Sequence, residues 1–263
     1  MLSTFQNIFN ADFSDLFEKT SQISVDQRKN SCSLIEFLFS SESPSNRFHI
    51  TFELIECYNL LIHMETWTRA RTRWMLVPFV DAAKRIGISP NWLTVLGLGL
   101  NIIAAILISQ EQIFWGGMVM TCLAMPLDAL DGELARRTNQ QGKFGAFFDS
   151  SLDRVADGAL MIGVAAYFMQ RADHLSVYVT FAAMVAQFMV SYTRARAEGL
   201  GIDCTVGLFG RFGRFLLIAA GLLLHPAFAE SLSLIVLVWA LTILSTATAI
   251  QRMWHVYRET AIG

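Results

Sequence analysis

Long apolar stretches separated by short polar loops are the feature that most constrains this chain. Beyond residue 89, runs of roughly twenty mostly apolar residues, the length that spans a bilayer core as an α-helix, alternate with brief loops rich in arginine, aspartate and glycine. The composition agrees, because 54% of the residues are hydrophobic and 16% are charged, which is too few charges for an ordinary soluble domain. The sequence therefore predicts an integral membrane protein that is entirely α-helical.

Helix-start signals and hydropathy predict six membrane-spanning helices. Ser89 supplies an N-cap residue and Pro90 occupies the first helical position, so the first span begins there and runs to about Ser109. The other five spans are expected at about 113–135, 147–170, 174–197, 212–226 and 229–252. Six spans place both ends of the bundle on one side of the membrane.

Two segments precede the first span. From Trp67 to Ile86, arginines alternate with tryptophans and other apolar residues, the pattern of an amphipathic helix in the headgroup layer; a helix packed on the bundle is the alternative. The composition changes abruptly at Met64, and residues 1–63 contain no apolar run that could span a bilayer. We therefore predict a membrane domain over 64–258, preceded by an N-terminal extension, 1–63, that is either an appendage or an over-long translation.

Positive charges lie mostly on one side of the predicted bundle. Arginine and lysine concentrate before the first span and after the second, fourth and sixth, whereas the opposite loops contain only Arg171. Since such charges mark the cytoplasmic side, the protein is expected in the cytoplasmic membrane with the loops after the second and fourth spans facing the cytosol. The net charge of −2 lacks the basic excess of nucleic-acid-binding proteins, which excludes that class of partner.

Four aspartates near the ends of the second and third spans carry the chemistry. Asp128 and Asp131 are three residues apart and Asp149 and Asp153 are four apart, so each pair shares one helix face and can point at the other pair. Clustered carboxylates near a membrane need compensating charge. Oxygen ligands without histidine or cysteine favour Mg²⁺ or Mn²⁺, and two such ions would clamp the oxygens of a phosphate ester or pyrophosphate.

A proline precedes the first aspartate pair. Inside a helix, Pro126 would leave the carbonyl of Cys122 without its usual donor and would kink the approach to Asp128. A proline without functional meaning in a membrane helix is the alternative interpretation.

The aspartates belong to a longer pattern, Asp128-x2-Asp131-Gly132-x2-Ala135-Arg136-x8-Gly145-x3-Asp149-x3-Asp153. This pattern resembles the full motif of the CDP-alcohol phosphatidyltransferase family. The similarity covers roughly 64–258 and leaves out 1–63. It implies a dimeric six-helix enzyme that moves a phosphatidyl or archaetidyl group from CDP-diacylglycerol or CDP-archaeol to a small hydroxyl acceptor and releases CMP.

The resemblance also implies roles for individual residues. Asp128, Asp131 and Asp149 would bind two divalent ions that hold the CDP pyrophosphate, while Asp153 would help to bind metal and would deprotonate the acceptor hydroxyl as the catalytic base. The residues expected to line the pocket for the CDP moiety are Gly132, Ala135, Arg136 and Gly145.

Flanking residues indicate the acceptor. The stretches 149–158 and 191–198 are most similar to the branch of the family that makes phosphatidylinositol phosphate or archaetidylinositol phosphate. Arginine suits a phosphorylated acceptor, although loop arginines can also simply follow the positive-inside pattern and contact lipid headgroups. The candidates for the acceptor phosphate are Arg154, Arg194, Arg196, Arg211 and Arg214.

One segment departs from that branch. Gly210 and Gly213 stand where the inositol phosphate enzymes usually carry glutamates, and Phe212 stands where they carry proline. Inositol phosphate is the expected acceptor, but because of this departure glycerol phosphate, inositol, serine and an unusual alcohol stay open as alternatives. Two other classes also stay open: membrane prenyltransferases, which bind diphosphates through aspartates, and cation transporters, in which intramembrane carboxylates mark ion pathways.

Overall fold

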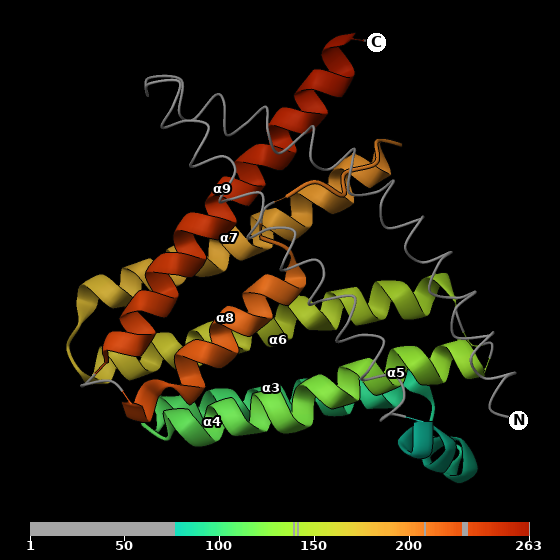
Figure 1. The fold of residues 1–263 in the computed structure, drawn as a ribbon, viewed down its shortest axis with the longest axis horizontal. Helices are drawn as coiled ribbons and strands as arrows, with labels where there is room; N and C mark the ends of the chain where they lie inside the picture. Colours follow the sequence, from blue (N-terminus) through green and yellow to red (C-terminus); the bar gives the residue numbers. More distant parts are fainter. Residues whose placement is uncertain (1–76, 139, 141, 208, 228–230, 263) are drawn as a thin grey trace, which may run out of the picture. The chain divides into compact units, whose positions relative to one another are not determined.

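The computed structural model describes residues 77–138, 140, 142–207, 209–227 and 231–262 (Figure 1). The regular structure in these residues is helical, with no strand, which confirms the predicted all-α class. The extension 1–63 and the first part of the predicted headgroup helix lie outside the described residues. Residues 77–86 are helical and are followed by α3 (Pro90–Ser109), α4 (Ile113–Val119), the π-helix η1 (Met120–Ala124), α5 (Met125–Arg137), α6 (Lys143–Gln170), α7 (His174–Gly199), α8 (Arg211–Leu223), the 3₁₀ turn η2 (His225–Ala227) and α9 (Leu232–Ile262).

The described residues fall into two compact units. Residues 77–192 and 209–249 form one of them, which we term the main unit, and residues 193–207 and 250–262 belong to the second. The motif aspartates all lie in the main unit.

Four stretches are long and apolar enough to cross a membrane: Pro90–Ser109, Ile113–Arg137, His174–Gly199 and Leu232–Ala261. The predicted spans that start near residues 90, 113, 174 and 229 are among them. Helix α6 has 28 residues and is long enough to span a membrane. It is not among the four apolar stretches because its first half carries Asp149, Asp153, Arg154 and Asp157. Helix α8 has 13 residues and is therefore about 20 Å long, less than the thickness of a bilayer core. The chain is an integral membrane protein.

Local signals explain where the helices around the site begin. Pro90 occupies the first turn of α3, where its missing N–H is not needed, but the preceding Ser89 makes no side-chain capping bond. The side chain of Asp173 accepts hydrogen bonds from the Ser176 hydroxyl at 2.6 Å and the Ser176 N–H at 3.1 Å. Both bonds lower the pKa of Asp173 below its ordinary value, and the bond from the hydroxyl has the larger effect. They also hold the chain in place just before α7.

A π segment lies directly before the turn that contains Pro126. Helices α4, η1 and α5 form one continuous helical stretch, in which Met120–Ala124 is π-helical. The N–H of Met125 bonds to the carbonyl of Met120, five residues back. One extra residue in a turn rotates everything after it by about 100° relative to an uninterrupted α-helix. The π segment therefore sets the face on which α5 presents its aspartates.

Small residues bring the helices that carry the site close together. A side chain at Gly163 of α6 would place its Cβ 2.5 Å from the carbonyl oxygen of Ala105 in α3, and one at Gly116 would lie 2.9 Å from the carbonyl oxygen of Ala104. Such glycine contacts are typical of helix packing in membranes. At the other end of α3, Val80 and Ala83 of the helix 77–86 pack in an apolar cluster with Leu93, Leu130 and Leu134.

Candidate active site

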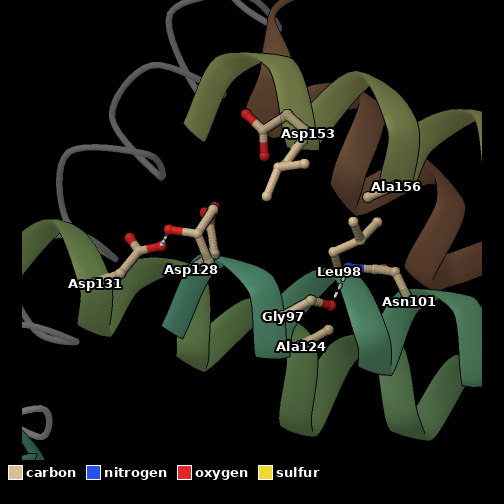
Figure 2. A pocket seen from close by; sticks show the side chains of 10 residues that line it. Gly97, Leu98, Asn101, Ala124, Asp128, Asp131, Asp153 and Ala156 are labelled. Carbon is tan, nitrogen blue, oxygen red and sulfur yellow. Dashed lines mark hydrogen bonds between the residues drawn. The ribbon is translucent and has the colours of Figure 1, made fainter. Parts of the chain in front are cut away.

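Carboxylates from α5 and α6 converge in the main unit. Asp128, Asp131 and Asp149 each offer one carboxylate oxygen, and these oxygens lie within 4.8 Å of one another. Asp153 lies one turn after Asp149 on α6 and faces Asp128 and Asp131 across a pocket (Figure 2). The structure thus brings the four predicted aspartates together, three of them within mutual reach of one cation.

The four carboxylates differ in burial and in partners. Asp131 is buried, and the hydroxyl of Thr94 in α3 donates a hydrogen bond of 2.7 Å to its Oδ2. The side chain of Asp128 is 42% exposed and that of Asp153 is 15% exposed. The Oδ1 of Asp149 is buried and has no hydrogen-bond partner among the described residues. A buried carboxylate oxygen without a donor is costly, and an all-oxygen donor set with such an orphan atom fits Mg²⁺ or Mn²⁺.

One arginine bridges this cluster. Arg211 is the first residue of α8, and its Nη2 donates to Asp128 Oδ1 at 2.9 Å and to Asp153 Oδ1 at 2.7 Å. At an effective dielectric constant of about 20, two unit charges 4 Å apart interact by about 4 kcal/mol. The guanidinium therefore offsets part of the repulsion between these two carboxylates, but a single positive charge does not balance four negative ones.

Two other arginines that were predicted to bind the acceptor phosphate form hydrogen bonds with α7. The Nη1 of Arg154 bonds to Asp157 Oδ2 at 3.1 Å and to the Ser191 hydroxyl, and its Nη2 lies 3.7 Å from Asp153. Arg214 is buried and donates from Nη1 to the carbonyl oxygen of Gln187 at 3.2 Å. Arg154 and Arg211 therefore contact the carboxylates, whereas Nη1 of Arg214 bonds to the backbone of α7.

The remaining predicted arginines belong to the second unit. Arg194 is exposed and pairs with Glu198 at 2.8 Å, one turn further along α7. Arg196 is exposed as well.

The residues predicted to line the CDP pocket lie on α5 and at the start of α6. Gly132 and Ala135 are half-buried, and a Cβ at Gly145 would meet only Asn91 Oδ1, at 3.8 Å. Arg136 is held by Glu133, whose Oε2 accepts from its Nε at 3.1 Å and its Nη2 at 2.9 Å. The side chain of Arg136 nevertheless remains 54% exposed, so its outer edge can contact a ligand.

Glu133, which the sequence reasoning did not single out, organises this region. Its side chain is 1% exposed, and its Oε1 also accepts a hydrogen bond of 3.0 Å from Arg137. A signal was present, because arginines follow this glutamate at positions i+3 and i+4. Thr94 and Ser191 were missed as site residues too, although polar side chains inside apolar spans commonly have functional roles.

The pocket has an acidic end and an end lined mostly by apolar residues. Asp128, Asp131 and Asp153 form the acidic end, next to Thr94 (Figure 2). Asn101 also lines the pocket and donates from Nδ2 to the carbonyl oxygen of Gly97 at 3.0 Å. The other lining residues are Gly97, Leu98, Ala124, Leu152 and Ala156. Such a pocket suits a ligand with a metal-bound phosphate and an apolar remainder.

Comparison with known proteins agrees with this geometry. The family model described as CDP-alcohol phosphatidyltransferase matches residues 87–250. A phosphatidylinositol phosphate synthase of Mycobacteroides abscessus is 35% identical over 186 residues, which cover 70% of this chain and 83% of the relative. An archaetidylinositol phosphate synthase of Methanothermobacter thermautotrophicus is 34% identical over 186 residues, which cover 69% of this chain and 90% of the relative.

Solved structures show the same likeness. The crystal structure of the Mycobacterium tuberculosis phosphatidylinositol phosphate synthase with CDP-DAG bound superposes with a TM-score of 0.65 at 28% identity, covering 69% of this chain and 93% of that one. The structure of that synthase with manganese and citrate gives a TM-score of 0.64 at 28% identity, covering 69% of this chain and 88% of that one.

Proposed function

The chain belongs to the CDP-alcohol phosphatidyltransferase family, and we propose that it transfers a phosphatidyl group from a CDP-activated lipid to inositol phosphate, with release of CMP. The observation that carries this proposal is the convergence of Asp128, Asp131 and Asp149 within 4.8 Å, next to a pocket whose other end is apolar. The relatives named phosphatidylinositol phosphate synthase and archaetidylinositol phosphate synthase and the likeness to a synthase crystallised with CDP-DAG support it.

Asp128, Asp131 and Asp149 would hold two Mg²⁺ or Mn²⁺ ions, with Asp153 as a further ligand. The buried, partnerless Oδ1 of Asp149 and the likeness to a synthase crystallised with manganese support this assignment. Bound there, the ions would neutralise the pyrophosphate and stabilise CMP as the leaving group. Thr94 would hold the carboxylate of Asp131 in a fixed orientation, since its hydroxyl donates to Oδ2 of that group.

Asp153 would be the catalytic base. The acceptor oxygen attacks the phosphorus next to the lipid alcohol, the bond from that phosphorus to the CMP oxygen breaks, and the hydroxyl proton passes to the Asp153 carboxylate. Its mostly buried position on the pocket wall would place it next to the acceptor. The CDP moiety would lie against Gly132, Ala135, Arg136 and Gly145, where the two glycines and the alanine leave room and the exposed edge of Arg136 offers donors.

The acceptor phosphate would be bound beside the base. Arg154 and Arg211 both approach Asp153, which favours them over the buried Arg214. The motif that contains Arg194 and Arg196 supports these two as further candidates. The closest alternatives to this assignment are the phosphate ester of another alcohol as the acceptor and a CDP-lipid with ether-linked chains as the donor.

We also propose the membrane arrangement that the sequence predicted. The catalytic membrane domain would comprise 64–258 and would form a homodimer. Each protomer would have six spans, namely the four apolar stretches together with α6 and α8. The helix 77–86 would lie in the headgroup layer, with Phe79 and Ile86 exposed and Val80 and Ala83 on the bundle. The active site would face the cytosol in the cytoplasmic membrane, and surrounding lipids would cover the exposed apolar residues.

CMP release tests the proposed reaction. The purified protein in detergent should release CMP from CDP-diacylglycerol when Mg²⁺ and inositol 1-phosphate are present, and EDTA should stop the release. Glycerol 3-phosphate, inositol and serine serve as competing acceptors, and CDP-archaeol serves as an alternative donor. Release with another acceptor would correct the assigned substrate. No release from either donor would contradict the reaction and favour a prenyltransferase or a transporter.

Replacing Arg154 with alanine should raise the KM for inositol 1-phosphate about tenfold or more, because a charge-assisted hydrogen bond to phosphate is lost. The KM for the CDP-lipid should change little. Steady-state kinetics with each substrate varied in turn checks this prediction. The control is Arg171→Ala, which removes an arginine at the C-terminal end of α6, where it pairs with Glu111 between α3 and α4. Equal increases in both KM values for Arg154→Ala would show a structural role instead.

A further inference from the structure

We propose that Arg211 competes with the divalent cations for the carboxylates and is transferred to the acceptor's phosphate when the cations bind. This inference rests on the proposed function, because it takes the aspartates as the metal site and a phosphate monoester as the acceptor. It adds a consequence that the family assignment does not contain: metal binding and acceptor binding should strengthen one another through one side chain.

Arg211 bonds to two of the carboxylates that are proposed to bind the metal ions. A single nitrogen, Nη2, bonds to Asp128 at 2.9 Å and to Asp153 at 2.7 Å. Asp128 also offers an oxygen to the cluster with Asp131 and Asp149. A carboxylate oxygen that accepts a hydrogen bond from a guanidinium has less negative charge to offer a cation, and the guanidinium repels the cation directly. Arg211 and a divalent ion therefore compete for these two carboxylates.

The position of Arg211 allows the exchange. It is the first residue of α8, Gly210 precedes it, and its side chain is 54% exposed. Its neighbour Arg214 is instead buried and bonded to the backbone of α7. A guanidinium displaced from Asp153 stays within the length of its own side chain from the proposed acceptor site, where a phosphate offers it a bidentate partner.

Thermodynamic linkage makes the coupling reciprocal. If the cation releases Arg211 for the phosphate, the phosphate must draw Arg211 away from the carboxylates and raise the affinity for the cation by the same factor. Coupling of this kind typically amounts to about fivefold or more. A side chain that only adds to the net positive charge would weaken cation binding but would create no coupling with the acceptor.

Binding of Mn²⁺, followed by electron paramagnetic resonance on the full-length protein in detergent, tests the inference without relying on turnover. Arg211→Gln should bind Mn²⁺ about fivefold or more tightly than the wild type, whereas Arg211→Lys, which keeps the charge, should stay near the wild type. Inositol 1-phosphate should tighten Mn²⁺ binding in the wild type, free inositol should not, and Arg211→Gln should lose this effect. Arg171→Gln is the control for the loss of one remote positive charge and should behave as the wild type.

The outcomes separate the two proposals. Equal or weaker Mn²⁺ binding by Arg211→Gln, or a phosphate effect that persists in this variant, would overturn the exchange while leaving the metal site in place. A wild-type protein that binds no Mn²⁺ would overturn the proposed function itself. Thermal unfolding tests whether each variant is folded. We expect the Arg211 variants to be folded, because the side chain of Arg211 is exposed.

Discussion

The Asp153→Asn variant should lose at least about a hundredfold in the rate of CMP release, the lower end of what a general base contributes. Asparagine has nearly the same size and can still accept a hydrogen bond from Arg211, which now bonds to Asp153 Oδ1 at 2.7 Å. Its amide cannot take a proton from the acceptor hydroxyl at neutral pH. The change therefore removes the base and leaves the shape of the pocket.

Two measurements distinguish this role from a loss of substrate binding. Binding of the CDP-lipid to Asp153→Asn should remain measurable, because Asp128, Asp131 and Asp149 still offer oxygens to a cation. Single-turnover CMP release should fall as much as steady-state release, since the chemical step itself is slowed. The control is Asp81→Asn, which alters an exposed aspartate paired with Arg137 at 3.5 Å. Turnover at the wild-type rate in Asp153→Asn would remove this residue from the mechanism.

The Gly163→Ala variant should be destabilised by about 3 kcal/mol or more, the upper range for overpacking. The added Cβ would lie 2.5 Å from the carbonyl oxygen of Ala105 and 2.9 Å from its Cα. These are backbone atoms, so no side chain can turn aside and the two helices must separate. Helix α6 carries Asp149 and Asp153, and α3 carries Thr94, so activity should fall together with stability.

A glycine on the partner helix provides the matched control. An added Cβ at Gly99 of α3 would have no neighbour within 4 Å, and alanine is a better helix former than glycine. Gly99→Ala should therefore unfold at the same temperature as the wild type or at a slightly higher one, while Gly163→Ala unfolds at a lower one. Thermal unfolding in detergent, with CMP release on the same samples, measures both. Equal unfolding temperatures for the two variants would show that α3 and α6 do not pack this closely.

Local spacing explains which parts of the site could be predicted. Asp128 and Asp131, like Asp149 and Asp153, lie one helical turn apart, so their sharing of a face follows from helix geometry alone. The lengths of the apolar runs predicted the helices in the same way, with α3 beginning at Pro90 as expected. The predicted fifth span, 212–226, ran three residues past the end of α8 at Leu223, although Pro226 is a local signal for a helix end just before it.

Contacts between distant residues could not be predicted by such rules. Thr94 bonds to Asp131, 37 residues away, and Arg211 bonds to Asp128, 83 residues away. From the sequence alone, other polar residues in these helices could equally have made these two contacts. The apolar cluster of Leu93 from α3 with Leu130 and Leu134 from α5 brings the first pair together, and no short-range pattern encodes it.

By itself, the sequence determined the helical class, the four aspartates as an oxygen-ligand set and the family motif, because these depend on residue types and on spacings within one or two turns. The tertiary structure decided how that motif is used. The π segment at Met120–Ala124 turns α5 by about 100° relative to an uninterrupted α-helix, because its wider turn holds one more residue. Arg211 and Arg214, three residues apart and alike in sequence, are separated in role because the first stands at the exposed start of α8 and the second is enclosed against α7.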